Sequence, residues 1–199
     1  YLVNKEISFE AAVAELPFIF WQYGNPEDAN QGCAKIPDAS ASTDELWAFL
    51  FDVNDPRQYG DAGIKFFGPY YYQVANELGG PAVKLSHLQS LLAFPYGITP
   101  FLPIGESPVF SNSTMLDITN WVAKESHHMM FTYGEFDPWS SAALRDFPRE
   151  TIADNHFYEI AGGNHSSNFT LLPENKKLEA IHVLSRWLGK PPALSLLLR

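Results

Sequence analysis

The spacing of apolar positions in the first third of the chain favours helices over strands. Ser8 can cap a helix that Pro17 ends or bends. The apolar positions of this helix are Phe9, Ala12, Val13 and Leu16. The aromatic stretch 16–23 fits either a buried helix or a strand, because its periodicity does not decide between them. A loop rich in Asn, Gly, Pro and Asp follows to about residue 41.

Helix signals continue after this loop. Ser42 and Glu45 form a capping box before a second apolar stripe, and the Asp-Pro pair at residues 55–56 closes that helix. Pro69 is well placed as the first residue of a third helix, which the glycine pair at residues 79–80 ends. We therefore expect helices and few strands in this part of the chain.

A further helix is predicted over residues 83–93, before a proline-rich connection over residues 95–108. This connection divides the chain into two regions of different character. Residues 1–105 are interpreted as a mainly helical cap region. Residues 106–199 are interpreted as the C-terminal part of an α/β domain.

The second region alternates between helical and strand patterns. Residues 114–124 and 174–188 are amphipathic at helical spacing, and residues 140–144 begin another helix. Residues 128–133 and 156–161 are short apolar or alternating runs next to glycine, which is typical of strands. The order helix, strand, helix, strand, helix is that of the closing portion of an open α/β sheet. The predicted fold class is therefore α/β.

Composition narrows the classes of function. The chain has 199 residues, of which 46% are hydrophobic and 15% aromatic, enough to bury a sizeable core. Its formal net charge of -10 disfavours nucleic acid as a partner, because phosphates are also negative. No apolar run approaches the roughly 20 residues that a membrane span needs. The single cysteine, Cys33, excludes a disulfide within the chain, and its polar loop offers no activating neighbour.

Two polar segments each follow a predicted strand and carry candidate catalytic side chains. Asp137 lies in the segment 133–139, YGEFDPW, and His165 lies in the segment 161–165, AGGNH. Because sites in open α/β sheets form at the carboxyl ends of strands, we expect both side chains on neighbouring loops. A carboxylate that holds one ring nitrogen of a histidine lets the other nitrogen act as a general base. Glu135 is a competing acid and ranks second.

A metal site is the main alternative for the same residue types. The suitable ligands are His127, His128, Asp137, His156 and His165. Their spacing matches no zinc signature, and the two adjacent histidines would face opposite sides of a strand. We therefore predict no metal, and no other cofactor is implied.

The two segments resemble the closing motifs of secreted serine peptidases related to prolyl carboxypeptidase and dipeptidyl peptidase II. The likeness is strongest to the bacterial branch of tripeptidyl-aminopeptidase-type enzymes, and the sequence SSNFTLLPE after His165 fits that branch better than the animal one. The stretch LPFIFWQYG, residues 16–24, resembles the helical cap of these enzymes. The resemblance extends over most of the chain.

This resemblance implies an α/β-hydrolase fold, of which the chain is the C-terminal part, and an aminopeptidase or prolyl-peptidase-like serine exopeptidase acting on short peptides. It maps the triad acid to Asp137 and the triad base to His165. We expect Trp139 to wall a substrate subsite and Glu135 to support the acid loop by hydrogen bonding. The resemblance also implies a secreted, periplasmic or cell-envelope location.

The nucleophile of such enzymes is missing from the sequence. No Gly-x-Ser-x-Gly elbow occurs, and the nearest candidate, Ser107, precedes Pro108, which has no N–H to offer an oxyanion. We therefore expect the serine in an upstream segment, so that the chain is a fragment, one piece of a nicked enzyme, or the partner of a separate chain. We expect the chain alone to be inactive. A non-catalytic binding module and an esterase on the same fold stay open as alternatives.

Overall fold

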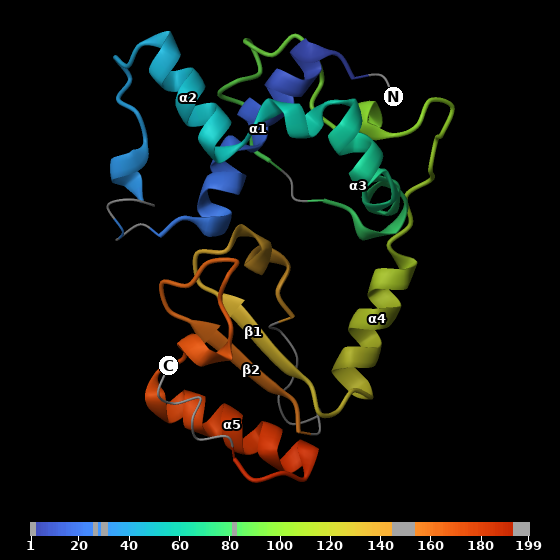
Figure 1. Cartoon of the computed structure of the whole chain (residues 1–199). Coiled ribbons are helices and arrows are strands. Elements are labelled where there is room, and N and C mark those ends of the chain that lie inside the picture. Colours follow the sequence, from blue (N-terminus) through green and yellow to red (C-terminus); the bar gives the residue numbers. More distant parts are fainter. Residues whose placement is uncertain (1–2, 26–27, 29–31, 81–82, 145–153, 193–199) are drawn as a thin grey trace. The chain divides into compact units, whose positions relative to one another are not determined.

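A computed structural model describes most of the chain as two compact units (Figure 1). The described residues are 3–25, 28, 32–80, 83–144 and 154–192. Unit 1 comprises residues 1–20 and 33–118, and unit 2 comprises residues 21–32 and 119–199. Within the described ranges, no helix is long and apolar enough to cross a bilayer. The division at residue 105 into a cap region and an α/β domain stays a prediction.

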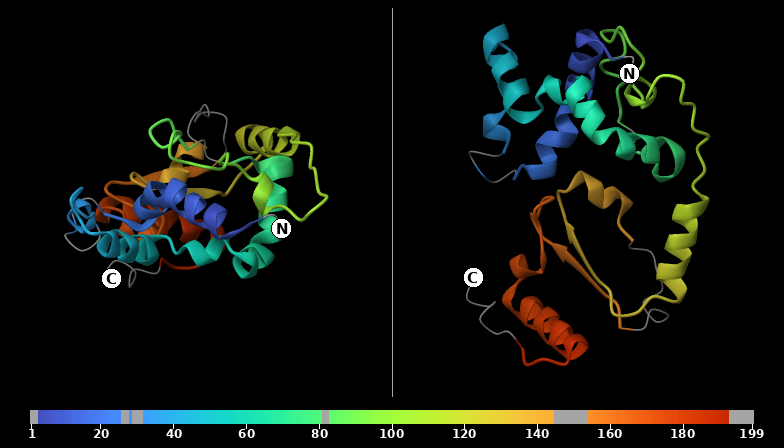
Figure 2. Two further views of the ribbon diagram at one scale, coloured as in Figure 1. Left: turned by 90° about the horizontal axis from the view of Figure 1, so that it is seen from above. Right: turned by 45° about the vertical axis from the view of Figure 1, so that its right-hand side comes forward.

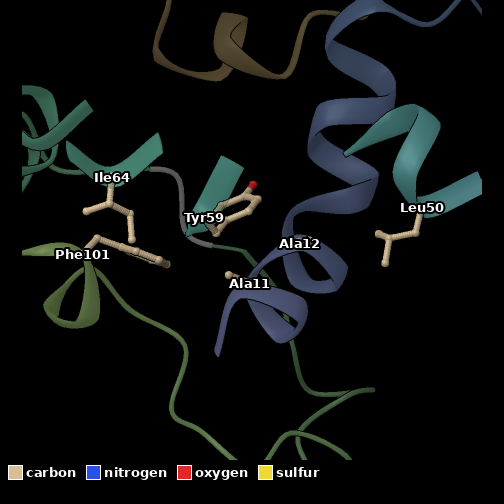
Figure 3. Packing of buried hydrophobic residues seen from close by; sticks show 6 residues of the cluster. All are labelled: Ala11, Ala12, Leu50, Tyr59, Ile64 and Phe101. Carbon is tan, nitrogen blue, oxygen red and sulfur yellow. The ribbon is translucent and has the colours of Figure 1, made fainter. Parts of the chain in front are cut away.

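Unit 1 is built from helices around one buried cluster. The helices are α1 (Lys5–Tyr23, its last turn in unit 2), α2 (Thr43–Val53), α3 (Asp61–Gln73) with a π-type turn at its end (Val74–Leu78), and 3-10 helices at Cys33–Lys35, Pro56–Tyr59 and Thr99–Phe101. The cluster consists of Ala11, Ala12, Leu50, Tyr59, Ile64 and Phe101 (Figure 3). Because these residues come from all three α-helices and two 3-10 helices, the cluster joins the helices into one core.

The start of α1 differs from the prediction. The helix begins at Lys5, and the side chain of Asn4 accepts a hydrogen bond of 2.8 Å from the N–H of Ile7. Ser8 lies inside the helix, where its hydroxyl donates to the carbonyl oxygens of Asn4 and Tyr59. Asn4 is therefore the capping residue, because an amide oxygen satisfies a free N–H of the first turn as well as a hydroxyl does.

Two prolines lie within helices rather than at their boundaries. α1 runs through Pro17 to Tyr23, so the aromatic stretch 16–23 is helical. Pro69 lies inside α3, which begins at Asp61, so its prediction as a first helical residue is wrong. A proline inside a helix removes one backbone hydrogen bond. Tertiary packing supplies most of the stability of a helix in a protein, and here it outweighs that loss.

Other helix signals in unit 1 have mixed outcomes. The capping box of α2 is confirmed, with the Ser42 N–H donating to the Glu45 carboxylate at 2.8 Å. Gly79, with φ at 70°, ends the third helical segment as predicted. The helix predicted over residues 83–93 is wrong, because residues 86–91 form turns and the flanking residues are not helical. The carboxylate of Glu10 in α1 accepts the N–H of Ala93 at 2.8 Å, a donor that a helix would have used for itself.

Unit 2 holds a small parallel sheet. β1 (Met130–Gly134) pairs with β2 (His156–Ile160) in the register Met130↔His156 to Gly134↔Ile160. α4 (Ser113–Lys124, in unit 2 from Thr119 on) precedes β1, and α5 (Glu174–Leu188) follows β2. These four elements are confirmed close to their predicted positions. Their order is consistent with an α/β protein, whereas the larger sheet of a hydrolase stays a prediction.

The segment after β1 contains a 3-10 helix at Pro138–Ala142, where the sequence predicts the start of a helix over residues 140–144. The Ser140 hydroxyl donates to the carbonyl oxygen of Gly134 at 2.8 Å. This bond ties the short helix to the end of β1. Residues 140–142 are helical as predicted, although this 3-10 helix begins at Pro138 and ends at Ala142, and residues 145–153 lie outside the described part.

α5 packs against one face of the sheet (Figures 1 and 2). The buried residues of this contact are Tyr158, Ile160, Leu172 and Ala180. A second contact lies just before β2, where Asp154 accepts a hydrogen bond of 2.6 Å from the indole of Trp187 and one of 3.1 Å from His156. Asp154 also pairs with Arg186. The end of α5 is thereby fastened to the start of β2.

Candidate active site

Asp137 is fixed by the turn that follows β1. It caps the 3-10 helix Pro138–Ala142, and its Oδ1 accepts the backbone N–H of Trp139 at 3.0 Å. The other oxygen, Oδ2, lies 2.8 Å from Nδ1 of His165. The Asp137 side chain is only 11% exposed. Each carboxylate oxygen therefore has its own partner, and the orientation of the group is set.

His165 is brought to Asp137 by the glycine-rich loop after β2. Gly162 has φ at 65°, a left-handed conformation that glycine adopts without strain. The loop also runs very close to the end of β1. A Cβ atom at Gly134 would lie 2.5 Å from the carbonyl oxygen of Asn164, so only a glycine fits there.

The contact predicted between Asp137 and His165 is present, and it leaves one ring nitrogen open. The His165 side chain is 41% exposed, and no described residue bonds to its Nε2. The rings of Tyr23 and Trp139 flank the imidazole, with ring centroids at 5.8 and 6.3 Å. A carboxylate on Nδ1 favours the tautomer whose Nε2 can accept a proton. The pair can therefore act as a general base towards a group placed at Nε2.

Glu135 and Trp139 both lie beside this pair. The carboxylate of Glu135 accepts the backbone N–H of Gly162 at 2.8 Å. It therefore bonds to the loop that carries His165, residues 161–168 (the histidine loop), and not to the His165 ring. Trp139 is 37% exposed, and its indole stands at an interplanar angle of 44° to the imidazole. Glu135 thus ties the two loops together, and Trp139 offers an apolar surface next to His165.

The end of α1 also reaches this site, which the sequence did not suggest. The backbone N–H of His165 donates to the carbonyl oxygen of Gln22 at 2.8 Å. The side-chain amide of Asn164 donates to the carbonyl oxygens of Tyr23 at 2.8 Å and Gly24 at 3.3 Å. The only sequence signal for these contacts is the asparagine next to His165, because no local pattern links segments so far apart.

The histidines considered as metal ligands do not gather around one point. His165 pairs with Asp137, whereas His128 and His156 both face Asp154, at 3.4 and 3.1 Å. Among the described residues, no group of three His, Cys, Asp or Glu side chains is arranged to hold a metal ion. The two side chains considered as nucleophiles are both exposed. Cys33 is a free thiol, and Ser107 lies in a segment without helix or strand.

Comparison with known proteins gives a family for this chain. The model of the family described as PS-10 peptidase S37 matches residues 2–196. A curated relative, the prolyl tri/tetrapeptidyl aminopeptidase of Streptomyces mobaraensis, is 35% identical over 191 residues. The matched region is 95% of this chain and 39% of the relative, so the chain spans well under half of that protein's length. No solved structure matches the chain. The resemblance drawn from the segments around Asp137 and His165 is thus confirmed, and the chain belongs to the PS-10 peptidase S37 family.

Proposed function

We propose that this chain supplies the acid and the base of a Ser-His-Asp triad, in a serine exopeptidase that acts on short peptides. The observation that carries the proposal is the 2.8 Å contact between Asp137 Oδ2 and His165 Nδ1, with Nε2 unoccupied by any described residue. The nucleophilic serine is proposed to lie in the part of the enzyme that this chain does not include. No cofactor is needed for this chemistry.

In the proposed mechanism, His165 accepts and then donates a proton in each of two half-reactions. Nε2 takes the proton of the serine hydroxyl while the serine oxygen attacks the scissile carbonyl carbon, and Asp137 stabilises the imidazolium that forms. His165 then gives the proton to the leaving amine as the peptide bond breaks. Water repeats the cycle on the acyl-enzyme, with His165 first as base and then as acid, which releases the acyl product and restores the serine.

The proposed substrate end is supported by the curated relative, which is named a prolyl tri/tetrapeptidyl aminopeptidase. We extend this to the present family member as removal of short peptides from the amino end of a chain. Trp139 is proposed to line a subsite next to His165, since its partly exposed indole lies beside the imidazole. We further propose that residues 1–105 form a helical cap region and that the enzyme is secreted, as in the enzymes that the sequence resembles.

The test is kinetic and uses the complete enzyme, in which this chain is joined to the proposed serine-bearing segment. His165→Ala removes the base, and Asp137→Asn favours the wrong tautomer, so kcat should fall by about 10⁴-fold in each. KM should change little, because these interactions matter in the transition state. His127→Ala is the matched control, since His127 is an exposed histidine whose ring meets His128.

Two results would refute the proposal. The first is activity near wild type in both His165→Ala and Asp137→Asn, which would favour a binding module on the same fold. The second is covalent labelling of a serine in the isolated chain by a serine-directed phosphonate, which would place the nucleophile within this chain. The isolated chain is expected to show neither turnover nor labelling.

A further inference from the structure

The loop that carries His165 is held by the last carbonyl groups of α1. These carbonyl groups have no partner within a helix and need donors from elsewhere. The backbone N–H of His165 donates to the carbonyl oxygen of Gln22. The side-chain amide of Asn164 donates to the carbonyl oxygens of Tyr23 and Gly24. The loop therefore caps the helix, and the helix in turn restrains the loop.

Asn164 uses both ends of its side chain for this purpose. Its nitrogen donates to α1, and its Oδ1 accepts the backbone N–H of Ser166 at 3.0 Å. An asparagine combines two N–H donors with an acceptor on a short side chain. An aspartate has no donor when ionised, and it would turn a negative charge towards the carbonyl oxygens of Tyr23 and Gly24.

We propose that Asn164 is a positioning residue of the active site, acting through His165. By fixing the backbone on the N-terminal side of His165 against α1, it keeps the imidazole Nδ1 within hydrogen-bonding distance of Asp137. The imidazole needs this support, since its side chain is 41% exposed and gains little from burial. The catalytic part of this inference rests on the function proposed above, whereas the positional part does not.

The positional part can be tested on this chain without activity. Multiple-bond proton–nitrogen NMR reports which ring nitrogen of His165 carries the proton, and the bond to Asp137 should hold the Nδ1–H tautomer. Asn164→Asp and the milder Asn164→Ala should both lose this single tautomer and show a mixture. Asn168→Asp is the matched control. Asn168 lies in the same loop and caps a 3-10 turn through the Thr170 N–H at 3.0 Å, a role that aspartate fills equally well. Among the described residues its amide donates only to Ser166, at 3.3 Å, so aspartate at this position loses a local bond and no bond to α1.

The catalytic part is tested in the complete enzyme. Asn164→Asp and Asn164→Ala should lower kcat by about 10- to 100-fold, as expected for a catalytic group displaced by about 1 Å. KM should stay within about twofold, because substrate contacts are unchanged. Asn168→Asp should match the wild type in both constants.

The inference is overturned if Asn164→Ala keeps the Nδ1–H tautomer and its kcat stays within about twofold of wild type. Thermal melts identify a variant that fails to fold, and Asn164→Ala then decides in place of Asn164→Asp. Failure of the proposed function would give another pattern of results. The His165→Ala variant would stay active, whereas the Asn164 variants would still show a changed tautomer of His165.

Discussion

The carboxylate of Glu135 accepts a hydrogen bond of 2.8 Å from the backbone N–H of Gly162, so the acid loop and the histidine loop are joined independently of the Asp137–His165 pair. Glu135 therefore has a supporting position, although it lies only two residues from Asp137. The two acids of the YGEFDPW segment thus differ in their contacts: Glu135 bonds to the backbone of Gly162, and Asp137 bonds to the ring of His165.

Replacing Glu135 by Gln should have a small effect on turnover. The amide oxygen of Gln can still accept the N–H of Gly162, so kcat should stay within about tenfold of wild type, far from the loss of about 10⁴-fold expected for Asp137→Asn. Glu135→Ala should lower the free energy of unfolding by about 1 kcal/mol, measured by denaturant titration. If Glu135→Gln is as damaging as His165→Ala while Asp137→Asn stays active, Glu135 is the triad acid.

Replacing Gly134 by Ala should disrupt the site by a steric route. The new Cβ would lie 2.5 Å from the Asn164 carbonyl oxygen and 2.8 Å from backbone atoms of Gly163, so the histidine loop must move. We expect a loss of about 1–3 kcal/mol in the free energy of unfolding, together with reduced kcat. Gly97→Ala is the control, because no atom lies within 4 Å of its added Cβ. Equal stability of the two variants would contradict the close approach.

Stability at acid pH should depend on Asp154. Its hydrogen bond from the Trp187 indole, followed by that from His156 and the charge of Arg186, lowers the pKa of this carboxyl group. A lowered folded-state pKa stabilises the fold above the unfolded pKa of about 3.9, and the effect is lost as the pH falls through the folded pKa. Asp154→Asn should therefore lower Tm near neutral pH, and the difference from wild type should shrink below about pH 4.

Asparagine is chosen because Asp154 has φ at 57°, a conformation that asparagine tolerates well. The substitution therefore removes the charge without adding backbone strain. A Tm difference that stays constant from neutral to acid pH would mean that the charge of Asp154 does not stabilise the fold.

Alkaline pH should unfold unit 1 through Tyr59, which is buried, and Tyr71, which is partly buried. Burial, followed by the charge of Glu15, raises the pKa of Tyr59 and raises that of Tyr71 to about 12. A raised folded-state pKa stabilises the fold below the unfolded pKa of about 10, and this contribution is lost as the pH rises through the folded pKa. Phenolate absorbance and circular dichroism should therefore change together above about pH 10.

Glu15→Gln is the matched variant for this titration. It removes the negative charge that faces the Tyr59 hydroxyl at 2.6 Å, so the pKa of both tyrosines should fall. Ionisation of all tyrosines near pH 10 without a change in circular dichroism would show that Tyr59 and Tyr71 are not shielded from solvent as described.

The strands and the pair of catalytic candidates could be predicted from the sequence because each depends on short stretches. Asp137 and His165 both follow a short run next to glycine, and parallel topology places the ends of both strands at the same edge. The helical region was harder to predict. The local effect of Pro17 and Pro69 is outweighed by packing in unit 1, and no window of sequence shows that Glu10 bonds to residues 93–94.

The end of α1 illustrates the limit of prediction from local pattern. The residues that bond to Asn164 and His165 belong to a stretch whose aromatic character indicated only burial. Their backbone carbonyl groups accept these hydrogen bonds, and every residue carries such a group. Side-chain chemistry therefore gives no signal for Gln22, Tyr23 or Gly24, and only the structure assigns them to the site.

The bond between Asn164 and Tyr23 joins residues 141 positions apart, and this separation bears on the order in which the protein folds. The segments that become β1 and β2 meet at the bond between Met129 and Asn155, a separation of 26. Closing the longer loop costs about 1.5 kcal/mol more chain entropy, so we expect the sheet to form before α1 docks on the histidine loop. The arrangement around His165 is then the last feature to form on refolding. In the complete enzyme, recovery of the proposed activity is therefore expected to be a stricter measure of a correctly refolded sample than circular dichroism.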